Sequence, residues 1–196
     1  MKSNVFNLTF TALFVALILL LGLTPLGLIS IFGVINVTIL CVPVIVGTLL
    51  MGLKTGMALG ACFGGISALA AFGIWGTPSA LAGALVSANP LLALIMCFVP
   101  RLMVPVVAHC TYQLFANGRA KSNKVVPIAA VAGSLTNTVL YLGMMLLFYV
   151  ISGIEAESLL TWIAGTGIFA GSAEALVAAL ISSPVLAALW KIKRTR

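Results

Sequence analysis

One arginine, Arg101, stands in the otherwise apolar stretch MCFVPRLMVPVVAH, residues 96–109. If a helix begins just after Pro90, Arg101 lies about 16 Å along it at ~1.5 Å per residue, near the middle of a hydrocarbon core ~30 Å thick. A charge at that depth is costly unless it is paired, and it usually faces a bundle interior and serves function. The planar fork of arginine holds carboxylates by two hydrogen bonds. We therefore expect Arg101 to bind an anionic ligand, most naturally a carboxylate.

A second interpretation of Arg101 stays open. Glu174 is the other charged residue at membrane depth, and a buried partner of opposite sign is the usual way in which such charges are tolerated. Under this interpretation the two residues form a structural ion pair.

Polar residues also recur in the stretch GSLTNTVLYLGMM, residues 133–145. Ser134, Asn137 and Tyr141 are three and four residues apart, so they share one face of a helix. In a helix that crosses in the opposite direction, Asn137 reaches about the depth of Arg101. A lone amide at mid-membrane is often a simple helix-to-helix contact. Two strong hydrogen-bonding groups at one depth favour a binding pocket instead.

Other chemistry is poorly represented. The 196 residues contain no GxxxxGK[ST] phosphate loop, no GxSxG and no HExxH, and they include three acids and one histidine. The four cysteines stand singly in apolar segments, which does not suit a metal site. We expect no enzyme activity, no ATP hydrolysis by this chain, and no metal or cofactor.

The elements that must position these residues follow from composition. The chain is 62% hydrophobic and 7% charged, with a mean hydropathy of +1.27, whereas about a quarter of residues are charged in soluble domains. Its long apolar runs show no period of two, so they predict helices rather than barrel strands. The sequence predicts an all-α integral membrane protein embedded in the lipid bilayer.

The charge map divides the chain into spans. No charge lies between Lys2 and Lys54, a length of about two crossings of ~20 residues, with a turn near the breakers Pro25 and Gly33. Residues 55–100 again hold two crossings, separated by an outer segment over 74–90 that we expect to form a lid. Further spans are expected over 128–151 and 160–190. The sequence thus predicts six transmembrane helices in one membrane domain, residues 1–196.

Basic residues fix the expected orientation. Outside the spans they fall at the two termini and in alternate loops, at Lys2, Lys54, Arg119, Lys121, Lys124, Lys191, Lys193, Arg194 and Arg196. The intervening loops carry none, and the last of them carries Glu155 and Glu157. By the positive-inside rule both termini are cytoplasmic. The net charge of +7 is therefore a topology signal, and no nucleic acid is expected as a partner.

Small residues predict where helices meet. Gly52, Gly56, Gly60 and Gly64 are four residues apart, and so are Gly167 and Gly171; such stripes let helix backbones approach closely. Near the N-terminus, TALFVALILL places Ala12 and Ala16 one turn apart on one helix face.

Together these features resemble the substrate-binding S component of an energy-coupling factor (ECF) vitamin transporter. The resemblance covers the whole chain and rests on the small six-span architecture, on Ala12 and Ala16, and on the step from Pro100 to Arg101. It implies a cell-membrane protein that binds a vitamin at its outer side and associates with an ECF transmembrane coupling subunit and two ATPase subunits. Ala12 and Ala16 would lie against the coupling subunit.

The resemblance also implies a ligand. Arg101 with Asn137 is similar to the pantothenate-specific members, in which these two residue types hold the vitamin. Pantothenate offers one carboxylate to a guanidinium, and an amide and hydroxyls to Asn137 and Ser134. Tyr141 and Trp75 complete the expected site. The alternatives are an S component for folate, pyridoxine or a thiamine precursor, and a structural membrane protein without a transport role.

Overall fold

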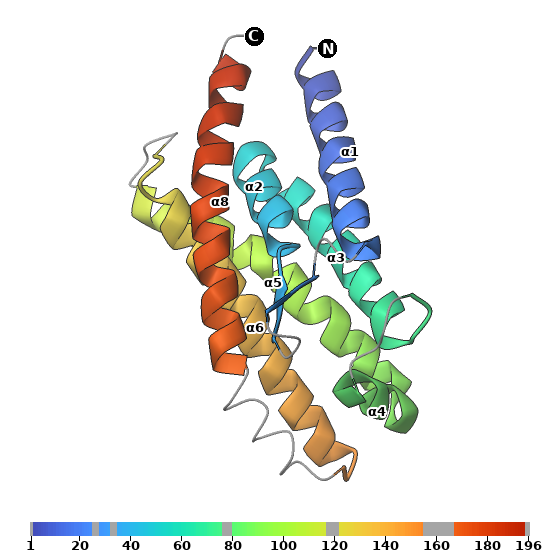
Figure 1. The fold of residues 1–196 in the computed structure, drawn as a ribbon. Helices are drawn as coiled ribbons and strands as arrows, with labels where there is room; N and C mark the ends of the chain where they lie inside the picture. Colours follow the sequence, from blue (N-terminus) through green and yellow to red (C-terminus); the bar gives the residue numbers. More distant parts are fainter. Residues whose placement is uncertain are drawn as a thin grey trace.

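The computed structural model describes residues 2–24, 28–31, 35–75, 80–116, 122–154 and 167–194. In chain order the elements are α1 Lys2–Leu23, β1 Leu28–Ile31, β2 Ile35–Thr38, α2 Cys41–Met51, α3 Leu53–Ala71, α4 Ala80–Ala88, α5 Pro90–Ala116, α6 Val126–Ile151 and α8 Ile168–Arg194. They form a helical bundle whose N- and C-terminal ends lie at the same end of the molecule (Figure 1). The prediction of a predominantly helical chain is confirmed.

Four helices among the described residues are long and apolar enough to cross a membrane: Leu53–Ala71, Pro90–Ala116, Val126–Ile151 and Phe169–Ile192. Two further apolar helical stretches, Asn7–Leu23 and Cys41–Met51, are shorter. Each of the six expected spans thus contains a helix among the described residues, and residues 160–166 of the last span lie outside them. The number of crossings stays a prediction.

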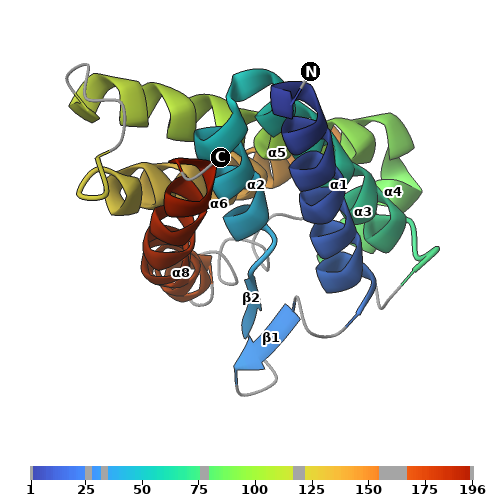
Figure 2. The ribbon, with the colours of Figure 1, turned by 90° about the horizontal axis from the view of Figure 1, so that it is seen from above.

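The short helix α2 lies at the centre of the bundle. It contacts α1, α3, α5, α6 and α8, and every residue from Cys41 to Thr48 is buried. Figure 2 shows it surrounded by longer helices when the bundle is viewed from the end that carries the termini. A helix that is apolar on all sides is stable only when it is enclosed in this way, which explains why its sequence shows no polar face.

A β-hairpin precedes α2, and this hairpin was not predicted. β1 and β2 are antiparallel, with Leu28 opposite Thr38 and Ile31 opposite Ile35. β2 also packs against α8. The sequence analysis placed a turn near Pro25 and Gly33 and did not foresee strands there, because an apolar run with many β-branched residues suits a strand as well as a helix.

Glycines set the spacing of α3 against α5, as predicted. A Cβ added at Gly60 would lie 2.7 Å from the carbonyl oxygen of Arg101, and one at Gly64 would lie 2.8 Å from the Phe98 ring. Gly171 meets Thr138 in the same way between α8 and α6. Gly52 has a different role, because its φ of +97° ends α2 and allows α3 to start in a new direction.

The expected lid contains a helix of its own, α4, which packs against α5 and α3. Its Ala82 and Leu85 join a buried apolar cluster with Met96 of α5 and with Met145 and Phe148 of α6. This cluster lies at the end of the bundle away from the termini (Figure 1). Residues 76–79 of the expected lid lie outside the described residues.

Candidate functional site

Arg101 lies near the middle of α5, and its side chain is enclosed by the bundle. The residue is 8% exposed. Its Cζ atom is 4.4 Å from the ring centroid of Tyr141 on α6 and 5.4 Å from that of Phe63 on α3. Both distances are within the range of cation–π attraction. Two aromatic rings from neighbouring helices thus flank the guanidinium.

Pro100 explains the hydrogen bond that Arg101 makes. In an α-helix the carbonyl of Met96 would accept from the amide of residue 100, but proline has no amide proton. The Arg101 Nη1 atom donates to this Met96 carbonyl instead, at 3.2 Å. The side chain therefore satisfies a backbone acceptor that its own preceding proline has left free.

Pro105 has a parallel effect on the backbone of Arg101. It leaves the Arg101 carbonyl without its helical amide donor, and that carbonyl oxygen faces Gly60 at the close α3–α5 contact. The missing side chain of Gly60 therefore lets the backbone of α3 come close to the backbone of Arg101.

Helix α6 brings the predicted polar residues to the same level. Gly133 faces Val104 and Ala108 of α5, whereas Tyr141, about two turns further along α6, reaches Arg101. The two helices run in opposite directions (Figure 1), so Ser134 and Asn137 lie between these two contacts.

The polar atoms of this segment are buried. Ser134 is 0% exposed and Asn137 is 6% exposed. Within the part of the chain that the structure describes, Ser134 Oγ, Asn137 Oδ1 and Arg101 Nε have no hydrogen-bond partner. Buried polar atoms are almost always paired in native proteins, so such a group calls for a functional explanation. A polar ligand would provide the missing partners.

Glu174 of α8 lies next to this group. It is 8% exposed, and its Oε2 atom accepts a hydrogen bond from Thr138 Oγ1 at 3.3 Å. The contacts that the structure gives Arg101 are the Met96 carbonyl and the rings of Phe63 and Tyr141, and Glu174 is not among them. The structural ion pair between Arg101 and Glu174 stays a prediction.

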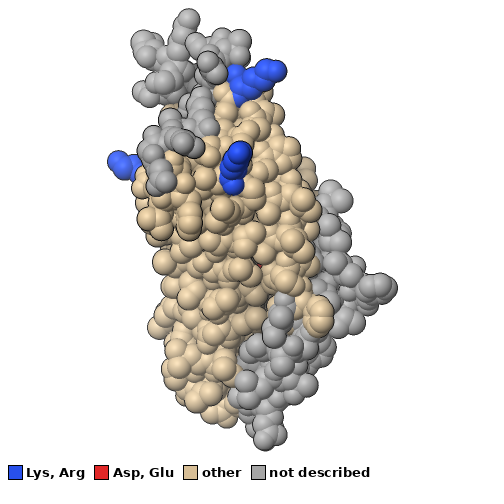
Figure 3. Space-filling model, turned by 90° about the vertical axis from the view of Figure 1, so that its left-hand side faces the viewer, with Lys and Arg blue, Asp and Glu red and all other residues tan. Residues whose placement is uncertain are grey.

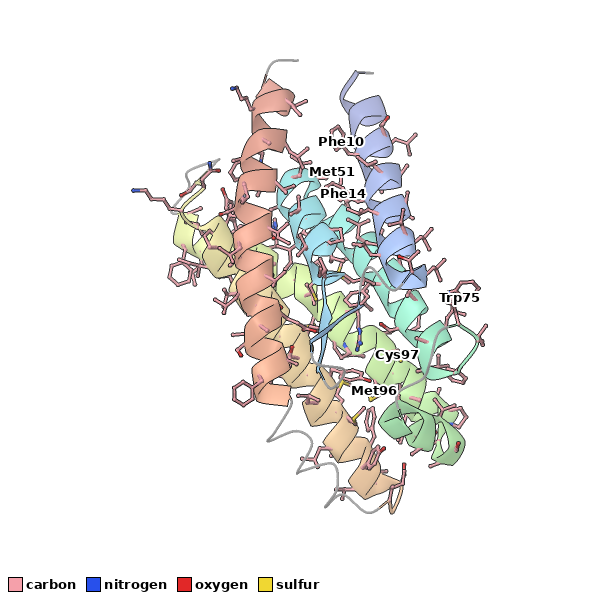
Figure 4. All side chains as sticks on the ribbon, in the orientation of Figure 1. Phe10, Phe14, Met51, Trp75, Met96 and Cys97 are labelled. Atoms are coloured by element: carbon pink, nitrogen blue, oxygen red, sulfur yellow. The ribbon has the colours of Figure 1, made fainter. Side chains whose placement is uncertain are left out.

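Trp75 is not brought to Arg101. It follows the end of α3, is 54% exposed, and donates its indole N–H to the Leu23 carbonyl at the end of α1, at 3.0 Å. Figure 4 shows it at the edge of the molecule, away from Met96 and Cys97 on α5. Its expected contact with the ligand therefore has no support from its position.

Ala12 and Ala16 both lie on the outward face of α1 and are exposed. The inward face of this helix carries Phe14 and Ile18, which are buried in the core. The structure therefore leaves the two alanines accessible to another membrane protein.

Sequence reasoning missed two parts of the arginine's surroundings. The role of the Met96 carbonyl could have been predicted from the sequence, because a proline leaves the carbonyl four residues before it without a donor. The contact with Phe63 could not have been predicted, since the glycine stripe of α3 indicates that this helix meets a neighbour but does not indicate which one. Chemically, the assembled group offers a delocalised cation, a hydroxyl and an amide, which suit a ligand with a carboxylate and further polar groups.

Comparison with known proteins agrees with this reading. Residues 6–186 match the family described as "ECF transporter, substrate-specific component". Over 98% of its length the chain is 27% identical to a protein named "Pantothenic acid transporter PanT" of Lactococcus lactis subsp. cremoris (strain MG1363), of which 97% is covered. The matched region includes every helix that contributes to the arginine site. Because the family match covers nearly the whole chain, this chain is a membrane protein that belongs to the family of substrate-specific components of ECF transporters.

Proposed function

We propose that this chain binds pantothenate on the extracellular side and that Arg101 holds the vitamin's carboxylate. The observation that carries the proposal is the state of the Arg101 side chain: a buried guanidinium flanked by two rings, whose Nε has no partner among the described residues. A buried cation requires a compensating anion. A carboxylate would supply both the charge and the acceptors for a bidentate pair.

The rest of the ligand would use α6. Asn137 Oδ1 can accept from an amide N–H or a hydroxyl, and Ser134 Oγ can donate or accept. Pantothenate has one amide and two hydroxyls beyond its carboxylate, so it matches these groups in kind. The name of the Lactococcus lactis relative, a pantothenic acid transporter, supports the same ligand.

We also propose six crossings with both termini in the cytoplasm. At ~1.5 Å per residue, the 22 residues of α1 extend about 33 Å. The four residues of β2 and the eleven of α2 extend about 13 Å and 16 Å in series, which also approaches the ~30 Å of a hydrocarbon core. Figure 3 shows basic side chains towards the end that carries the termini, which supports the orientation.

The energy for uptake would come from partner subunits. Members of an ECF transporter family act with a membrane coupling subunit and ATPase subunits, and we propose that the exposed alanines of α1, Ala12 and Ala16, contact the coupling subunit. Small residues at a helix surface allow another helix to approach closely.

The test is equilibrium binding of labelled pantothenate to membranes that contain the wild type or Arg101→Ala. Pantothenol, which has an alcohol in place of the carboxylate, is the competitor. We expect saturable binding to the wild type, only weak competition by pantothenol, and loss of pantothenate binding in the variant. Binding that Arg101→Ala leaves intact would contradict the role of the arginine. No binding to the wild type would contradict pantothenate as the ligand, and folate, pyridoxine and thiamine precursors would then be screened in the same assay.

A further inference from the structure

We propose that Pro100 is a positioning residue for Arg101. It keeps the Met96 carbonyl available, so that Nη1 is tied to the helix and the opposite edge of the guanidinium, formed by Nε and Nη2, is presented to a carboxylate. The inference rests on the proposed function, because it assumes that a carboxylate binds at Arg101.

The first step concerns the geometry of arginine. The guanidinium is planar and has two faces and several N–H edges. Nη1 is the nitrogen on the same side of the Nε–Cζ bond as Cδ, whereas Nη2 lies on the side of the Nε hydrogen. Nε and Nη2 therefore form the side-on edge, which matches the two oxygens of a carboxylate.

The second step is how this structure uses each part. Phe63 and Tyr141 flank the guanidinium with their rings, and Nη1 donates to the Met96 carbonyl at 3.2 Å. Nε is buried and, across the residues that the structure describes, lacks an acceptor. Nη1 thus has a hydrogen-bond acceptor within the protein, whereas Nε, which belongs to the side-on edge, has none among the described residues.

The third step is why the Met96 carbonyl is free. A residue with an amide proton at position 100 would complete the helical hydrogen bond to Met96. Nη1 would then have to share an acceptor that already has a well-aligned donor, and the side chain would lose the contact that fixes its orientation. Proline at position 100 prevents this competition. Because pre-orientation lowers the cost of ordering a side chain on binding, it raises affinity.

Two substitutions at position 100 distinguish the effect of the missing amide proton from the effect of the proline ring. Pro100→Ala supplies an amide proton. The α-hydroxy analogue of alanine, lactic acid, has the same side chain at that position but an ester oxygen in place of the N–H. Pro184→Ala is the matched control, because Pro184 is also inside a helix, α8, but is exposed and is not a contact of Arg101.

The readouts are the affinities for pantothenate and for pantothenol, measured in the full-length protein together with its thermal unfolding midpoint. We expect Pro100→Ala to weaken pantothenate binding about tenfold, which corresponds to ~1.4 kcal/mol, and to leave the weaker binding of pantothenol unchanged. The lactic acid variant should bind pantothenate as the wild type does, and so should Pro184→Ala. A purely structural role for Pro100 would lower both affinities together.

Wild-type affinity in Pro100→Ala, or an equal loss in the alanine and lactic acid variants, would overturn the proposal. If Pro100→Ala does not fold, a second variant replaces the peptide bond between Met96 and residue 97 by an ester, which makes the Met96 carbonyl a weaker acceptor and leaves Pro100 in place. The control variant carries an ester between residues 97 and 98 instead. Selective loss of pantothenate affinity in the first ester supports the proposal, and equal affinities in both esters contradict it. The proposed function fails on a different result, namely no binding to the wild type or full binding to Arg101→Ala.

Discussion

The Arg101 guanidinium and the Tyr141 ring come from the antiparallel helices α5 and α6 and meet with Cζ 4.4 Å from the ring centroid. The ring attracts the cation through its electron-rich face and offers no formal charge that would compete with an anionic ligand. The pair therefore lowers the cost of burying the guanidinium without neutralising it. Tyr141, which was predicted from spacing as a ligand contact, supports the arginine in the structure.

The first prediction separates the ring of Tyr141 from its hydroxyl. Tyr141→Phe keeps the aromatic face and should bind pantothenate nearly as well as the wild type. Tyr141→Leu removes a cation–π contact of about 0.5–2 kcal/mol, so its affinity should fall by about 2- to 30-fold. Equilibrium binding with both variants checks this. If Tyr141→Phe were the weaker of the two, the hydroxyl would contact the ligand directly.

The second prediction concerns the buried polar atoms of α6. Asn137 Oδ1 and Ser134 Oγ are buried and lack a hydrogen-bond partner among the described residues. Replacing such unsatisfied atoms by an apolar group of similar size is neutral or stabilising, by up to about 1 kcal/mol. Asn137→Leu and Ser134→Ala should therefore keep or raise the unfolding midpoint while lowering pantothenate affinity. A lower midpoint in Asn137→Leu with unchanged affinity would show that the amide joins two helices and does not bind the ligand.

Spacing placed Tyr141 on the helix face that meets Arg101, whereas the roles of Ser134 and Asn137 at the site stay predictions. The reason is that depth in a membrane follows from the number of residues since the last polar end, at a fixed rise per residue. Two antiparallel helices with polar residues at equal depth must bring them together once the helices are neighbours. The α5–α6 contact meets this condition.

Other features could not be obtained in this way. The segment 28–38 is as apolar as a helix of the same length, yet β1 and β2 pair as a hairpin and β2 contacts α8. Trp75 was included in the site expected from the resemblance, but its indole N–H donates to the Leu23 carbonyl at the end of α1. Both outcomes depend on tertiary neighbours, which local sequence does not specify.

The third prediction tests the close approach of α3 and α5. Gly60→Ala would place a Cβ 2.7 Å from the Arg101 carbonyl oxygen, whereas a Cβ at Gly65 meets nothing within 4 Å among the described residues. Gly60→Ala should lower the free energy of unfolding by about 1–3 kcal/mol and weaken ligand binding. Gly65→Ala, in the same helix, should be stabilising by up to about 1 kcal/mol. Thermal unfolding in detergent compares them, and equal midpoints would contradict the packing described.

The fourth prediction addresses the structural interpretation of Arg101. The proposed ligand-binding role predicts that Arg101→Ala leaves folding nearly intact, so the stability effects of Arg101→Ala and Glu174→Ala should be additive in the double variant, within about 0.5 kcal/mol. An ion pair would instead give two destabilised single variants and a double variant that regains stability. Unfolding midpoints of the four proteins without ligand distinguish the two results.

The fifth prediction concerns the outward face of α1. Ala12 and Ala16 are exposed, so Ala12→Leu and Ala16→Leu should fold and bind pantothenate like the wild type, because the added side chains project away from the core. The same side chains would hold a coupling subunit away from the helix surface, since close helix contact in membranes needs small residues. We therefore expect copurification with the coupling subunit and ATP-dependent uptake to fall at least tenfold. Ala188→Leu on α8, also at an exposed alanine, is the control. Uptake at the wild-type rate in both α1 variants would move the coupling contact to another face of the protein.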